Sequence, residues 1–189
     1  MKKQHYLFLF ICTFLFNLTN TEAQNIKVEK GYSPQIGTTV SMLKDLKKRV
    51  TNSVRNLDQT GTDFLIDENA NRIGALILHL AATEAYYQVY TFQNRGFNRA
   101  ESVKWDTALN LGDKAREELR GKPIQYYLDI WDDVREKTLK LLKTKDDKWF
   151  EKKIKGTSMN NHWAWYHVME HQANHMGQIR FFIKRIPND

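Results

Sequence analysis

Residues 33–57 read SPQIGTTVSMLKDLKKRVTNSVRNL, a stretch whose apolar side chains recur every three or four positions. Those side chains belong to Val40, Leu43, Leu46, Val50, Val54 and Leu57. Positions three and four apart share one face of an α-helix, so the spacing predicts an amphipathic helix through residues 40–57. Ser33 and Pro34 are typical of a helix start, as an N-cap and a first-turn proline. The turn residues between Asp58 and Asp63 end this helix.

Three further stretches show the same helical spacing, and no segment shows the period-two alternation of a strand. They run from about Asp67 to Phe92, from Pro123 to Leu142 and from about Asn161 to Ile186. Pro187 ends the last of them, because proline cannot continue a helix. Residues 94–121 are a long connection that we expect to contain a short helix at Asp113–Arg120. The sequence therefore predicts an all-α fold, a four-helix bundle with a long crossover between its second and third helices.

The composition is that of one ordinary globular domain. The chain has 189 residues, of which 41% are hydrophobic and 12% aromatic, with only 3 Pro and 9 Gly. That much apolar surface can form a buried core, which excludes a disordered or collagen-like chain.

The N-terminus has the pattern of a secretory signal peptide. Lys2 and Lys3 precede a short apolar run, and Thr21-Glu22-Ala23 offers a cleavage site. The run is apolar on every face, which disfavours an amphipathic anchor helix, and it is too short to span a hydrocarbon core of about 30 Å. We therefore expect residues 1–23 to be removed. Residues 24–189 are then a single domain with no membrane span, exported to the periplasm or secreted.

Removal of this segment leaves a chain without cysteine. The single cysteine, Cys12, lies within it, so the mature chain has no disulfide, no thiolate nucleophile and no cysteine metal ligand. The formal net charge falls from +7 to +6, because two lysines and one glutamate are lost. The most basic stretch, Lys143–Lys155, is interrupted by acidic residues. We expect it to be a solvated loop and predict no nucleic-acid partner.

Histidines are the residues that point to chemistry. Five remain after cleavage, and His167, His171 and His175 form one stripe along the fourth helix, because positions four apart lie on the same face. Two such imidazoles can bind one metal ion at about 2.0–2.1 Å, and a third ligand must then come from another helix. His79 is the histidine of the second helix, where nearby alanines leave space beside it. Three neutral imidazoles suit Zn, Ni, Fe or Cu, whereas histidines satisfied within a structural core are the alternative.

Two familiar metal motifs do not fit this chain. Gln172 follows His171 at the position where an H-E-x-x-H protease has its general-base glutamate, which disfavours zincin-type peptide hydrolysis. Ferritin-like di-iron sites need a glutamate three residues before a histidine on two helices. Here the residues three before His79, His171 and His175 are Leu76, Val168 and Gln172.

Two segments resemble the motifs of a known family, the DinB/YfiT-like metalloenzymes. His79-Leu-Ala-Ala-Thr-Glu84 is similar to that family's H-L-A-x-x-E segment. Residues 163–179, WAWYHVMEHQANHMGQI, are similar to its W…H-x-x-E-H-x-x-H-H-R-G-Q-I signature. The resemblance extends over essentially the whole mature chain, including Gly121-Lys-Pro123 before the third helix. It implies a four-helix bundle with a three-histidine metal site.

Carried onto this chain, the family's ligands are His79, His171 and His175, binding a divalent metal such as Zn, Ni or Fe. We expect their nitrogens to converge within about 4 Å, with His167 lining the cavity and His162 outside the cluster. Three positions depart from the family pattern. Asn174 replaces a common histidine, Met176 a common arginine and Gln172 a common glutamate.

The resemblance implies a metal-dependent enzyme that hydrolyses, or transfers a group on, a small-molecule substrate. Relatives include thiol-dependent transferases and isomerases that use bacillithiol or mycothiol, and an amide hydrolase; the catalytic group would be a water or thiol on the metal. Glu170 is offset from His171 by about 100° around the helix, so we expect it to form a surface or inter-helix pair. The resemblance also implies pairing into a homodimer. A non-catalytic metal-binding bundle and a purely structural bundle are the alternatives.

Overall fold

The computed structural model describes residues 25–187, which fold into helices joined by turns and loops. The helices are α1 Pro34–Val54, α2 Gln59–Thr62, α3 Ile73–Gln93, α4 Arg99–Asn110, α5 Gly112–Glu118, α6 Ile124–Leu142, α7 Asp147–Glu151 and α8 Asn161–Ile183. No strand occurs among these residues, so the predicted all-α class is confirmed. The predicted signal peptide, residues 1–23, lies outside the described residues and stays a prediction.

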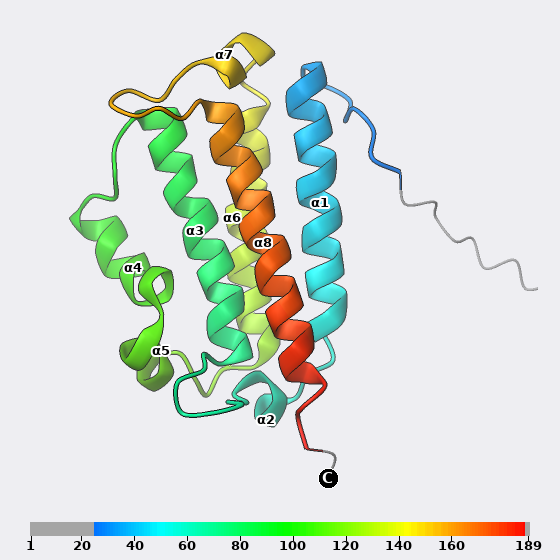
Figure 1. Ribbon diagram of the computed structural model, residues 1–189, viewed down its shortest axis with the longest axis vertical. Coiled ribbons are helices and arrows are strands. Elements are labelled where there is room, and N and C mark those ends of the chain that lie inside the picture. The colour runs from blue at the N-terminus through cyan, green and yellow to red at the C-terminus, as the bar shows by residue number, and fades with distance from the viewer. Residues whose placement is uncertain (1–24, 188–189) are drawn as a thin grey trace, which may run out of the picture.

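Four long helices, α1, α3, α6 and α8, form a bundle (Figure 1). The helices α1 and α8 run in one direction, and α3 and α6 run in the opposite direction. Helix α3 packs against α6 and α8, and α1 packs against α8 and α6. Because α3 and α6 are parallel, the chain has to return along the bundle between them. Helices α4 and α5 make this return beside α3, as the predicted crossover requires.

The predicted apolar stripes form the core of the bundle. Val40, Leu43, Val50 and Val54 of α1 are fully buried. Trp131 of α6 and Trp165 of α8 are among the largest fully buried side chains. Each large apolar side chain removed from water in this way contributes roughly 1.5–3 kcal/mol. The stripes therefore account for why the four helices associate.

The predicted second helix begins six residues too early. The structure starts α3 at Ile73, whereas the sequence pattern placed the start near Asp67. The carboxylate of Asp67 accepts a hydrogen bond from the backbone N–H of Asn69 at 2.8 Å, which is a turn motif that competes with a helix. Arg72 then donates to the backbone carbonyls of Asp63 and Arg116, which fixes the loop before α3.

Helix α4 was not predicted within the 94–121 connection. It begins with a capping box in which Asn98 accepts from the backbone of Glu101 and Glu101 accepts from the backbone of Asn98. Only Trp105 and Ala108 of this helix are buried. Two apolar positions are too few to show the spacing of a helix in the sequence. Helix α5 lies close to the short helix that was predicted at Asp113–Arg120.

The stretch Lys143–Lys155 is not the solvated loop that its charge predicted. It contains α7, and Phe150 and Ile154 are buried against the rest of the domain, although most of its charged side chains are exposed. Asp147 of α7 accepts hydrogen bonds at the N-terminus of α1. Within residues 25–187, no helix combines the length and apolar character that crossing a membrane requires.

Candidate metal centre

His79 is held on α3 by a contact from the crossover. The residue is 9% exposed, and Ala75 and Ala82 of the same helix are fully buried. The Nδ1–H of His79 donates to the backbone carbonyl of Ala108 at 2.9 Å. Ala108 lies in the last turn of α4, where carbonyl groups have no partner inside their own helix. The crossover that the sequence did not resolve therefore fixes the orientation of this imidazole.

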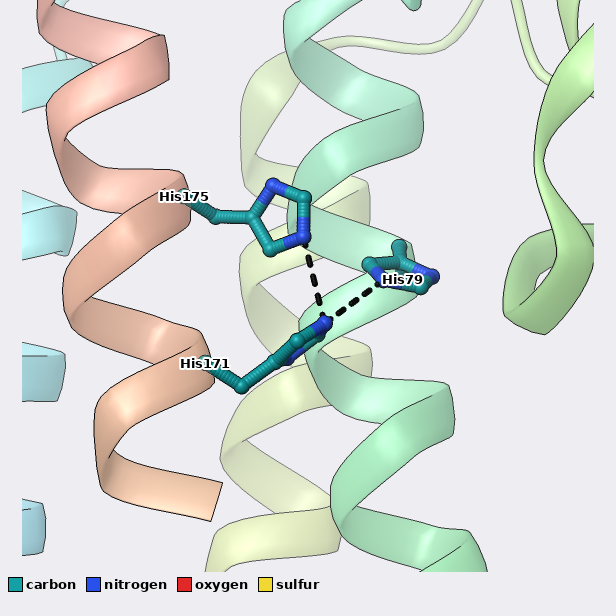
Figure 2. A group of neighbouring side chains, drawn as sticks. All are labelled: His79, His171 and His175. Atoms are coloured by element: carbon teal, nitrogen blue, oxygen red, sulfur yellow. Dashed lines mark hydrogen bonds between the residues drawn. The ribbon is translucent and has the colours of Figure 1, made fainter. Parts of the chain in front are cut away.

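His171 and His175 lie one turn apart on α8 and face His79 on α3 (Figure 2). The Nε2 atom of His171 lies 3.0 Å from Nε2 of His79 and 3.2 Å from Nε2 of His175. The candidate ligand atoms of all three residues lie within 4.8 Å of one another. The group is thus slightly wider than the expected 4 Å, and Nε2 of His171 is the atom that contacts both of the other rings (Figure 2).

The hydrogen bonds around the cluster fit a bound cation. His79 donates its Nδ1–H to Ala108, and His175 donates its Nδ1–H to Oε1 of Gln178 at 2.9 Å, so both neutral rings carry a lone pair at Nε2. His171 has one proton in its neutral form and can direct it to only one of these two neighbours. At least one of the two neighbouring Nε2 lone pairs is therefore left without a proton donor. A metal ion coordinated by the Nε2 atoms satisfies all three rings, so the cluster could bind a divalent metal.

Burial keeps these imidazoles neutral. It lowers the pKa of His79 to about 4, against the opposing effect of the hydrogen bond to Ala108. Burial and the neighbouring histidines lower the pKa of His171 to about 3. The pKa of His175 is also lowered by burial, while Gln178 acts in the opposite direction. The Nδ1 atom of His171 is buried without a partner among the described residues. Neutral imidazole is the form that binds metals, so the site is prepared for coordination near neutral pH.

The other two histidines of α8, His162 and His167, lie outside the cluster. The ring centroid of His167 is 6.1 Å from that of His171, and its Nδ1–H donates to Glu170 at 3.2 Å. The ring of Trp163 stacks on that of His167, with the ring centroids 5.1 Å apart. His162 is exposed and stacks on Phe150. Glu170 therefore forms a surface pair, as expected.

A buried polar network beside the cluster was missed by the sequence reasoning. The carboxylate of Glu84 accepts hydrogen bonds from Arg135 at 2.7 and 2.8 Å and from Trp131 at 3.0 Å. Thr138 and Gln172 also donate to it, at 2.7 and 3.1 Å. Burial acts to raise the pKa of Glu84, but Arg135 and the other donors lower it overall. The sequence did contain a sign of this network, because Glu84 occupies a position of the predicted second helix whose neighbours on the same face are mostly apolar.

The three departures from the family pattern lie outside the histidine cluster. Gln172 is buried and bonded to Glu84 and Arg135, so it holds helices together rather than acting as a base. Asn174 lines an outer cavity with Ile26 and Met42. Met176 packs against the apolar core.

The comparison with known proteins agrees with the motifs and with this geometry. The model of one protein family, described as mycothiol-S-transferase, matches residues 38–182. No curated protein matches the chain significantly. The matched residues extend from α1 into α8 and include all three clustered histidines. The chain therefore belongs to the mycothiol-S-transferase family, within the DinB/YfiT-like group that its motifs predicted.

Proposed function

We propose that this protein is an exported, divalent-metal-dependent enzyme that transfers a group on a small-molecule substrate. The observation that carries the proposal is the convergence of three histidine Nε2 atoms whose outer nitrogens, on His79 and His175, are committed to Ala108 and Gln178. We assign His79, His171 and His175 as the metal ligands. All three donors are imidazoles, which suit Zn, Ni or Fe.

The metal supplies the electrophilic chemistry of the site. When bound, a divalent cation acts as a Lewis acid and lowers the pKa of a coordinated water or thiol. The residues of the chain orient the ligands around it. The Ala108 carbonyl and the Gln178 side chain fix the tautomer and the direction of two imidazoles, and an acceptor at the outer nitrogen of a ligand ring also raises the basicity of that ligand.

His167 is the neighbouring residue best placed to exchange a proton with a substrate. Its Nδ1–H is directed to Glu170, which leaves Nε2 as the free position of the ring. Its ring lies 6.1 Å from that of His171 and is partly exposed. We therefore assign His167 a role in proton transfer and Glu170 the role of orienting it.

Group transfer is favoured over hydrolysis by the family to which the chain belongs, since that family is described as a thiol S-transferase. The chain's single cysteine, Cys12, lies in the predicted signal peptide, so a reacting thiol has to come from a small molecule. An exported protein would meet an extracytoplasmic thiol.

The test uses the mature protein without a polyhistidine tag, loaded separately with Zn, Ni or Fe. We expect loaded protein to consume a low-molecular-weight thiol in the presence of an electrophile, and His171→Ala to lose this activity. His162→Ala is the matched control and should keep it. A loaded protein whose metal has no exchangeable water would contradict catalysis and favour the metal-binding bundle instead.

A further inference from the structure

A basic cavity lies between α1 and α6, apart from the histidine cluster. Its volume is about 290 Å³, and four of the seven residues that line it carry a positive charge. These are Lys44, Lys47, Lys48 and Arg135. The one acidic residue in the lining is Asp132. None of the lining residues belongs to the proposed metal site.

Two of the cations are almost completely buried. The side chain of Lys47 is 10% exposed and that of Arg135 is 6% exposed. The Lys47 ammonium pairs with Asp132 and lies 4.9 Å from the centre of the Trp131 ring. Burying a cation is unfavourable unless partners compensate for the lost hydration. Arg135 is compensated by Glu84, whereas the partner of Lys47 is an exposed carboxylate, so an anion in the cavity would add to the compensation of Lys47.

Arg135 has hydrogen-bonding capacity left over. Its guanidinium has five N–H groups. Four of them have partners: two on Glu84, one on the carbonyl of Leu43 and one on Gln172. The remaining N–H, on Nη1, has no partner among residues 25–187.

Thr51 offers a second unused donor in the same wall. Its Oγ1 is buried and has no hydrogen-bond partner among the described residues. Thr38, Thr39 and Ser53 of the same helix instead donate to the carbonyl four residues before them. A buried polar group without a partner is unfavourable, so an occupant that accepts this hydrogen bond would gain from binding.

We propose that this cavity binds a small tetrahedral oxyanion such as phosphate. Ammonium, guanidinium and hydroxyl donors line one small space, and an oxyanion presents acceptors in several directions at once. The volume lies at the lower end for ligand sites, which suits a small ion. The carboxylate of Asp132 is 64% exposed, so it can turn outward when the anion replaces it beside Lys47. The site is independent of the proposed metal chemistry.

The test is an NMR titration of the mature protein with inorganic phosphate at constant ionic strength, with sodium chloride as the balancing salt. We expect saturable shifts confined to α1 and α6. Lys47→Met should raise the Kd for phosphate about fivefold or more, because it removes a charge-assisted hydrogen bond. Thr51→Val, which keeps the shape of the side chain, should raise it about threefold.

Two variants serve as controls. Lys140→Met removes an exposed cation of α6, and Thr38→Val removes a hydroxyl that is bonded to its own helix; both should stay within about twofold of the parent. If Lys47→Met does not fold, Thr51→Val decides the question. Linear shifts without saturation, equal shifts with chloride, or unchanged affinity in Thr51→Val would overturn the proposal. Acetate that binds as tightly as phosphate would overturn the tetrahedral assignment.

Discussion

Gln178 touches His175 at the nitrogen that faces away from the other histidines. Its Oε1 accepts the Nδ1–H at 2.9 Å, which directs Nε2 of His175 toward His171. Loss of the hydrogen-bond partner of a ligand histidine typically lowers metal affinity about 10–100-fold. We therefore predict that Gln178→Ala binds Zn at least about tenfold more weakly in a chelator-competition titration. Gln125→Ala, a glutamine of α6 bonded to Asp129, is the control and should match the parent.

The lowered pKa values of the histidines make the stability of the metal-free protein depend on pH. The pKa of His79 is about 4 in the folded state, mainly because of burial, and 6.5 is the ordinary value that applies when the chain unfolds. Between these values the unfolded state binds more protons, so the free energy of unfolding falls as the pH drops from about 7 toward 4. Urea unfolding of chelator-treated protein at pH 7 and pH 5 should show this loss. His79→Gln should show a smaller loss, and an equal loss in both proteins would contradict the assignment.

At the scale of the elements, α7 supplies the cap that α1 lacks. Ser33 occupies the predicted N-cap position, but its hydroxyl donates to Asp147 rather than capping its own helix. The carboxylate of Asp147 accepts from the backbone of Gln35 at 3.2 Å and of Ile36 at 3.4 Å. Burial acts to raise the pKa of Asp147, yet these hydrogen bonds lower it overall. The contact therefore favours the ionised form.

We predict that Asp147→Ala lowers the free energy of unfolding by about 1–2 kcal/mol, because the first amides of α1 lose their acceptor. Chemical denaturation at neutral pH measures this change. Asp113→Ala removes a fully exposed carboxylate and should cost less than about 0.5 kcal/mol. Equal losses in the two variants would show that Asp147 does not cap α1.

The sequence was sufficient for the long helices and insufficient for the short ones. Apolar spacing over many residues identified α1, α3, α6 and α8, since their core-facing sides are long. Helix α4 buries two side chains and α7 buries one, so neither has a period to detect. The start of α3 was also misplaced, because the hydrogen bond from the backbone N–H of Asn69 to the Asp67 side chain forms a turn where the sequence predicted helix. These short elements are stabilised by contacts that depend on the tertiary fold.

For the whole molecule, the Glu84 network joins the bundle at its centre. Glu84 of α3 bonds to Arg135 of α6 and to Gln172 of α8, and Arg135 also donates to the carbonyl of Leu43 of α1. All four long helices therefore meet at one buried ion pair. Removing one partner of such a pair leaves an uncompensated charge in the core.

We predict that Glu84→Ala lowers the free energy of unfolding by about 3–5 kcal/mol. The double variant Glu84→Leu with Arg135→Met should be more stable than Glu84→Ala, because it leaves no unpaired buried charge. Denaturant unfolding of the three proteins measures the differences. A double variant less stable than Glu84→Ala would contradict this account of the network.

The histidines of the candidate site could be identified from the sequence, but their surroundings could not. The four-residue spacing on α8 and the family motif together singled out His79, His171 and His175. The partners of these rings are a backbone carbonyl at Ala108 and a side-chain amide at Gln178. A carbonyl has no sequence signature, and the position of Ala108 depends on a helix that the sequence did not reveal.

The central claim is that His79 of α3 and the two histidines of α8 share one metal ion. Elemental analysis of mature protein purified without a polyhistidine tag tests it most directly. We predict about one divalent metal ion per chain in the parent and in His162→Ala, and far less in His79→Ala, because two imidazoles are too few for a tight site. A His79→Ala protein that holds as much metal as the parent would contradict the claim.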